Sequence, residues 1–147
     1  MQRGLGALVL LAATPSWVAA GEVRTQFAVT AYVPPRASIQ AISEPAQLSI
    51  SEQDLARGYV DVAAVYRVSN NDPAGYVLRL APRTGLTSAV EVSGLASRVV
   101  MRDDVVDVSQ PPALRPQQLN VSFRLMLAPA AVPGTYALPV HVAVFAL

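Results

Sequence analysis

The fold is decided by the sequence Pro133-Gly134-Thr135-Tyr136-Ala137-Leu138-Pro139-Val140-His141-Val142-Ala143-Val144-Phe145-Ala146-Leu147. After the Pro-Gly turn, apolar side chains recur at every second position, which is the period of one face of a β-strand. These side chains are Tyr136, Leu138, Val140, Val142 and Val144. A valine-rich strand needs a neighbour for its backbone groups, either within its own sheet or from another chain. Which neighbour it has is the functional question.

Short valine-rich segments, separated by Pro, Gly, Asn and Asp, recur through the rest of the chain, and almost no stretch has helical spacing. The sequence therefore predicts an all-β fold, for which one sandwich of two antiparallel sheets is the economical arrangement. We predict strands over Val23 to Val33, Ala37 to Ile42, Gln47 to Ile50, Tyr59 to Val68, Tyr76 to Ala81, Ala89 to Val92, Arg98 to Arg102, Leu119 to Ala128 and Thr135 to Leu147.

Three other segments have their own signals. A short helical turn is predicted over Ser51 to Gly58, with a capping-box pair at its start and a glycine at its end. The segment Asn70 to Gly75 has the residue types of a hairpin connection. The segment Ser109 to Gln118 contains three prolines and predicts an irregular crossover.

The first residues have the layout of an export signal. A positive head at Arg3 precedes a short apolar stretch, and small residues follow up to Ala20. We expect residues 1–20 to be a signal peptide, with the mature chain beginning at Gly21 and keeping no membrane span. Residues 21–35 then form an N-terminal alternating strand, and residues 36–147 form the β-sandwich domain.

The charge balance and the absence of cysteine argue against some classes of partner and site. The chain has 11 basic residues, all arginine, against 10 acidic ones, so nucleic acid is a poor partner. It has no cysteine, which excludes disulfides, thiol catalysis and thiolate metal sites.

Catalytic and metal sites find little support in the sequence. The sequence has a single histidine, His141, and its pattern indicates no nucleophile and carboxylate that would form a catalytic triad with it. Asp103, Asp104 and Asp107 are the densest acidic group, but they lack the glycine and terminal glutamate of a calcium loop. We interpret the carboxylates around Glu52 as solvated side chains beside the helical turn and not as a catalytic acid–base pair. We therefore predict a protein that is not an enzyme and that has no cofactor, metal or catalytic residue.

The N-terminal segment alternates as clearly as the C-terminal one, and Pro34-Pro35 follows it as a stiff break. An alternating strand at each end suits head-to-tail β-augmentation, in which the N-terminal strand of one subunit fills a groove beside the C-terminal strand of the next. The donated residues are then Val23, Thr25, Phe27, Val29 and Ala31.

On these features the chain resembles chaperone–usher pilin subunits, particularly the group with spore-coat-protein-U-like domains. In that family a glycine lies fourteen residues from the C-terminus, as Gly134 does here, before an alternating strand with an aromatic near its end. Here the aromatic is Phe145, whereas the family's usual penultimate position holds Ala146. Family members also commonly have a disulfide, which this chain cannot form.

The resemblance implies an immunoglobulin-like antiparallel β-sandwich that lacks its final strand and is completed by donor-strand exchange. It implies an exported structural subunit of a surface fibre or coat, with like subunits, a periplasmic chaperone and an outer-membrane usher as partners. Tyr136, Leu138, Val140, Val142 and Val144 are then the acceptor strand, facing the chaperone before the donor.

One alternative stays open. Val23 to Val33 also fits the ordinary first strand of a closed sandwich, because alternation does not distinguish a donated strand from a native one. The protein is then a self-complete secreted module that binds a protein or carbohydrate ligand through Asn70 to Gly75 and Ser109 to Gln118.

Overall fold

A computed structural model describes residues 28–83 and 85–147 of the chain. Residues 33–147 form one compact unit, and residues 1–32 belong to a separate N-terminal unit. Of that second unit only residues 28–32 are described, and they are exposed and outside any strand or helix. No helix among the described residues is long and apolar enough to span a membrane.

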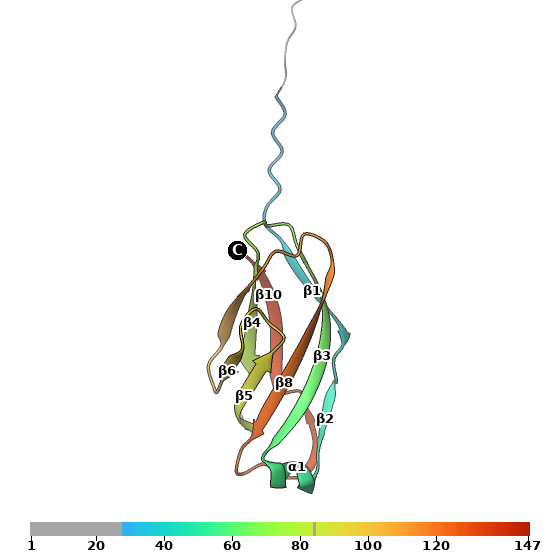
Figure 1. The fold of residues 1–147 in the computed structure, drawn as a ribbon, viewed down its shortest axis with the longest axis vertical. Coiled ribbons are helices and arrows are strands. Elements are labelled where there is room, and N and C mark those ends of the chain that lie inside the picture. Colours follow the sequence, from blue (N-terminus) through green and yellow to red (C-terminus); the bar gives the residue numbers. More distant parts are fainter. Residues whose placement is uncertain (1–27, 84) are drawn as a thin grey trace, which may run out of the picture. The chain divides into compact units, whose positions relative to one another are not determined.

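The body is an all-β sandwich in which every strand pairing is antiparallel (Figure 1). The larger sheet has the strand order β1-β3-β8-β5-β6. Its strands are β1 (Ala37–Ser43), β3 (Tyr59–Asn70), β8 (Gln117–Leu127), β5 (Thr87–Ser93) and β6 (Val99–Met101). A second sheet has the order β10-β4-β7, with β10 (Val140–Ala146), β4 (Tyr76–Pro82) and β7 (Val106–Gln110). A third, two-stranded sheet pairs β2 (Gln47–Ile50) with β9 (Gly134–Ala137).

The core lies between the layers and consists of the alternate apolar residues that the sequence pattern indicates. In β3 every second side chain from Val60 to Val68 is buried, and in β8 the same is true from Val121 to Leu125. Val68, Leu78, Val90, Val92, Phe123 and Leu125 are 0 % exposed. With no cysteine in the chain, this apolar packing and the strand hydrogen bonds hold the body together.

The predicted helical turn is present as α1 (Glu52–Arg57). The Ser51 hydroxyl accepts a hydrogen bond from the Asp54 N–H at 3.2 Å, and the Asp54 carboxylate accepts one from the Ser51 N–H at 2.9 Å. Gly58 ends the helix with φ 80°, a left-handed conformation that glycine adopts without the Cβ penalty. These two caps explain why a helix of six residues forms between two strands.

The predicted hairpin at Asn70 to Gly75 is wrong. These residues do form a turn, but β3 pairs with β1 and β8, whereas β4 pairs with β10 and β7. The turn therefore carries the chain from one sheet to the other. The buried Asn70 amide fixes it, because Nδ2 donates to the Gly75 carbonyl at 2.8 Å and Oδ1 accepts from the Ala113 N–H at 2.5 Å.

The predicted crossover is correct only in its middle. Ser109 and Gln110 belong to β7, which the sequence analysis missed, and Gln117 already starts β8. The prolines still interrupt strand pairing between the two elements, because proline has no backbone N–H to donate.

The predicted C-terminal strand is divided into two. β9 pairs with β2, whereas β10 pairs with β4 in a different sheet. Pro139 lies at the break, where it has no N–H to donate, and its carbonyl accepts from the Arg83 N–H at 2.7 Å. A continuous strand over Thr135 to Leu147 is therefore incorrect.

Candidate functional site

On one side of the body, two edge strands from different sheets lie close together without pairing with each other. Within residues 28–83 and 85–147, β1 pairs only with β3 and β10 pairs only with β4. β1 and β10 belong to different sheets and lie near each other at this side (Figure 1). Each therefore has one edge whose N–H and C=O groups are paired with no strand among the described residues. Such an edge is a template for another strand.

The inward side chains at this side are less buried than their neighbours in the sheets. Val142 lies opposite Leu80, which is 1 % exposed, and is itself only partly buried. Val144 is also only partly buried, whereas Leu78, which lies opposite it, is fully buried.

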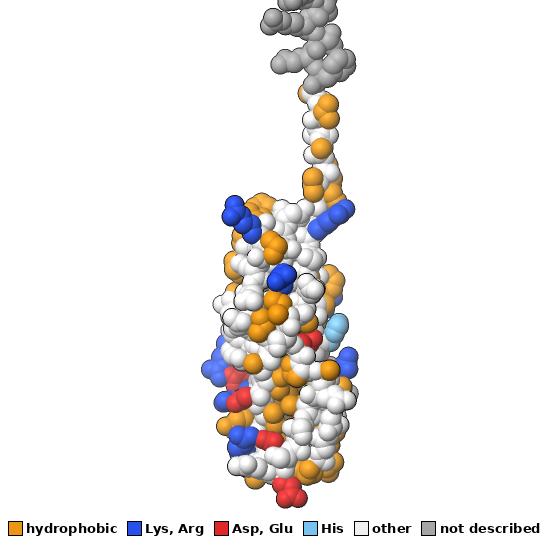
Figure 2. Space-filling view, turned by 90° about the vertical axis from the view of Figure 1, so that its right-hand side faces the viewer, with side chains coloured by type: hydrophobic (Ala, Val, Ile, Leu, Met, Phe, Trp, Pro, Cys, Tyr) orange, Lys and Arg blue, Asp and Glu red, His pale blue; other side chains and the backbone are white. Residues whose placement is uncertain are grey.

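β1 repeats this pattern. Ile39 lies opposite Val68, which is 0 % exposed, yet Ile39 is only partly buried. The burial of the core therefore falls off along both edge strands. Figure 2 views the side on which β1 and β2 lie in Figure 1, and it shows hydrophobic side chains down the middle of that face.

A groove of about 810 Å³ lies at the end of this side where β1 begins and β10 ends. We call it the β1–β10 groove. Among its lining residues only Arg36 is charged. The lining residues are Val33, Pro35, Arg36, Ala37, Ser38, Ser69, Asn70, Asn71, Leu114, Pro116, Val144, Phe145 and Ala146. Its walls offer apolar contact and strand edges rather than titratable groups.

The sandwich is closed toward its other end by the pairing of β2 with β9. Of the five residues predicted to form the acceptor strand, only Val140, Val142 and Val144 lie on β10. Tyr136 is in β9 opposite Leu48 and lines a separate cavity of about 370 Å³. Leu138 lies between the strands and is buried.

Only two of the predicted donor residues, Val29 and Ala31, are described by the structure. Val23, Thr25 and Phe27 lie outside the described residues. Val29 and Ala31 are exposed and belong to no strand, and Val29 is 91 % exposed. The segment from Ala28 to Val33 thus differs from the predicted strand, and it forms no first strand of the sandwich.

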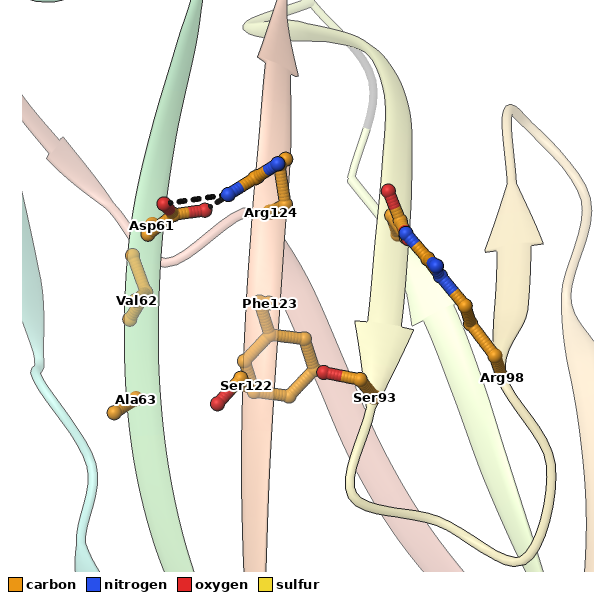
Figure 3. Close-up of a pocket in the computed structure, with 9 residues that line it drawn as sticks. Asp61, Val62, Ala63, Ser93, Arg98, Ser122, Phe123 and Arg124 are labelled. Carbon is orange, nitrogen blue, oxygen red and sulfur yellow. Dashed lines mark hydrogen bonds and ion pairs between the residues drawn. The ribbon is translucent and has the colours of Figure 1, made fainter.

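A third hollow, of about 560 Å³, lies on the outer face of the larger sheet (Figure 3). Arg124 binds Asp61 through two hydrogen bonds, at 2.8 and 3.0 Å, and this contact holds the pKa of Asp61 below its usual value. Arg98 forms an ion pair with Glu91 on the same face. Because these four charges satisfy one another, they leave no unpaired charge to attract a ligand.

Of the three aspartates singled out in the sequence, Asp107 is engaged in a structural contact, whereas Asp103 and Asp104 are exposed between β6 and β7. Asp107 holds Arg79 by hydrogen bonds of 2.8 and 2.7 Å, which lower the pKa of Asp107, and Arg79 also lies over the Phe145 ring. Glu44 accepts a hydrogen bond from the Tyr66 hydroxyl at 2.7 Å. Among the described residues, no three His, Cys, Asp or Glu side chains gather as a metal site would require.

His141 lies on β10 opposite Ala81 and is exposed. It alternates with Val140 and Val142, so it faces away from the core. The outward placement agrees with the alternation in the sequence.

Sequence analysis missed one wall of the groove. Ala37 and Ile39 of β1 pack against the core beside the open side, and nothing in their short alternating pattern distinguishes an edge strand from a central one. Asn71 Oδ1 accepts a hydrogen bond from the Arg36 N–H and Asn71 Nδ2 donates to the Pro34 carbonyl, and the sequence gives no signal for these contacts beyond a turn residue type. Comparison with protein-family models, with curated proteins and with solved structures finds no match to this chain.

Proposed function

We propose that the protein is an exported structural subunit of a surface fibre or coat, and that subunits join by strand donation. The occupant of the β1–β10 groove is the N-terminal segment, residues 21–33, of a second copy of this chain. One observation carries the proposal: β1 and β10 are adjacent edge strands of different sheets, do not pair with each other, and have incompletely buried inward side chains.

The length of the N-terminal segment supports this occupant. β10 has seven residues, which corresponds to about 23 Å of strand. Residues 21–33, fully extended, span roughly 43 Å at the same rise per residue. The segment is therefore long enough to lie along all of β10 and still reach its own body.

The chemistry of the segment also fits. Val23, Phe27 and Val29 lie on one face of the alternating pattern, and the groove that receives them is mostly apolar. Strand edges supply backbone hydrogen bonds, while alternate side chains enter the sandwich. In this proposal the assembly partners are a periplasmic chaperone, which covers the groove during export, and an outer-membrane usher.

Phe27→Ala tests the proposal. Phe27 is the largest apolar side chain on the donated face, and burying such a side chain contributes roughly 1.5–3 kcal/mol. The variant of the mature chain should assemble more slowly, as measured by sedimentation, while the thermal unfolding of a subunit capped with a synthetic peptide of residues 21–33 stays unchanged.

Gln26→Ala is the matched control, because Gln26 lies on the opposite face of the alternating segment and should leave assembly unchanged. A mature wild-type chain that stays monomeric at high concentration and does not bind the peptide would contradict strand donation. That result would favour the self-complete binding module instead.

A further inference from the structure

One aromatic side chain lies at the rim of the β1–β10 groove. Among the described residues that line this groove, Phe145 is the one aromatic, and it is 45 % exposed. Phe145 follows the inward-facing Val144 on β10, so its ring lies on the outer face of the three-stranded sheet, beside the free edge of β10. The exposed ring is therefore available to contact a strand that pairs with this edge.

Two residues of the same sheet hold the Phe145 ring from the side away from that edge. The guanidinium of Arg79, on β4, lies over the ring with its central carbon 4.7 Å from the ring centroid. Arg79 Nε and Nη2 donate hydrogen bonds to the carboxylate of Asp107, on β7, at 2.8 and 2.7 Å. The strand register explains the contact: Arg79 lies opposite Ala143, so Phe145 is its diagonal neighbour on β10.

This arrangement orders the ring before any strand docks. A bidentate pair with a carboxylate fixes the plane of the Arg79 guanidinium. The cation over the ring face favours one orientation of Phe145 over the others. A side chain that is already ordered loses less conformational entropy on binding. Asp107, on the far edge of the sheet, thus acts on a ring beside the free edge.

The proposed donor segment would bring side chains to this ring. A strand that pairs with the free edge of β10 places its outward side chains across from those of β10, with Cβ atoms about 4.5–5.5 Å apart. In residues 21–33 the outward side chains are the even-numbered ones, which include Arg24, Gln26 and Tyr32. In either direction of the segment, one of the outward side chains then lies beside Phe145.

We infer that Phe145 contacts the N-terminal segment of a second copy, and that Arg79 and Asp107 are positioning residues that hold its ring for this contact. The inference rests on the proposed function. It extends the binding surface from the inward side chains of the groove to the outer face of the three-stranded sheet.

The test measures binding of a fluorescently labelled synthetic peptide of residues 21–33 to the mature chain. Phe145→Leu should weaken binding roughly two- to tenfold, because the aromatic contact is lost. Phe145→Tyr keeps the ring and should bind like the wild type. Arg79→Met should weaken binding roughly two- to fivefold, because methionine keeps an apolar stem but provides no cation over the ring.

A double variant distinguishes positioning from an independent effect of Arg79. If Arg79 acts through the ring, adding Arg79→Met to Phe145→Leu should cause no further loss of affinity.

Arg124→Met is the matched control. Arg124 makes the same two kinds of contact on the larger sheet, with Asp61 at 2.8 and 3.0 Å and over the Tyr59 ring at 4.5 Å. None of these three residues lines the β1–β10 groove, so peptide affinity should be unchanged.

Urea unfolding establishes that each variant compared is folded. If Arg79→Met does not fold, Asp107→Asn replaces it, because it removes the charge that fixes the guanidinium and keeps the size of the side chain; it should weaken binding in the same direction.

The outcomes separate this inference from strand donation itself. Wild-type affinity in Phe145→Leu or in the positioning variant, an equal loss in Phe145→Tyr and Phe145→Leu, an equal effect of Arg79→Met with and without the ring, or an equal loss in Arg124→Met would each overturn the inference and leave strand donation standing. Wild type that neither assembles nor binds the peptide would contradict both proposals.

Discussion

Val144→Thr is the most direct probe of the open side, because it changes polarity while almost preserving shape. Val144 lines the β1–β10 groove and is only partly buried, so in the free subunit a threonine hydroxyl there can still reach water. A docked strand would remove that water. Burying a hydroxyl without a new hydrogen bond costs about 1–3 kcal/mol, which corresponds to a roughly 5- to 150-fold loss of affinity for the donor strand.

The same substitution at Val92 provides the control. Val92 is 0 % exposed and lies in β5 opposite Phe123, so the hydroxyl is desolvated in the free subunit already. Val92→Thr should therefore lower the free energy of unfolding by about 1–3 kcal/mol and leave peptide affinity unchanged. Val144→Thr should instead weaken peptide binding and leave the free energy of unfolding nearly unchanged.

Two measurements on the mature chain decide the comparison: urea unfolding, and titration with a fluorescently labelled synthetic peptide of residues 21–33. The reasoning is refuted if Val144→Thr destabilises the free subunit as much as Val92→Thr does while peptide affinity stays at the wild-type value. That result would mean that the side chain at position 144 is already shielded from water in the free subunit and that no strand covers it on binding.

Three further predictions concern the body and the leader. Gly94→Ala should lower the free energy of unfolding by roughly 2–5 kcal/mol in urea titration, because φ is 90° and an added Cβ meets the Asn120 carbonyl; an effect below 1 kcal/mol would contradict this packing. Hydrogen bonds within the α1 cap lower the pKa of Asp54 from 3.8 to about 2, so its contribution to stability is present above about pH 4 and is lost as the pH falls toward 2. Asp54→Asn should therefore flatten the melting temperature against pH over that range, and an unchanged slope would be the contrary result. N-terminal sequencing of exported protein should begin at Gly21, whereas an intact Met1 would remove the signal-peptide prediction.

Local patterns predicted most single elements because their causes are local. The alternation in β3 and β8 follows from one face meeting the core, and the capping box of α1 lies within four consecutive residues. The all-β class and the antiparallel sandwich were predictable on the same ground.

Pairing between strands could not be predicted in the same way. The turn at Asn70 looks like a hairpin because its residue types satisfy a tight backbone, yet the distant Ala113 amide binds it and the chain changes sheets. Pro139 was visible in the sequence, but its effect depends on β2 and β4 offering separate partners on either side of it. The unpaired edges of β1 and β10 could not be predicted for the same reason. Whether a strand lies at the edge of a sheet depends on which distant segments pair with it.

The attachment of β1 has a mechanical consequence for a fibre built in this way. Tension entering a subunit at Val33 would pass through the hydrogen bonds of Asn71 with Pro34 and Arg36 and run along the axis of β1, whose partner residues on β3 extend from Asn70 to Val65. A pull along a strand loads its ladder of hydrogen bonds together, whereas a pull across it opens them one after another. A subunit without disulfides would then resist extension through this shear geometry, with its first strand as the anchor.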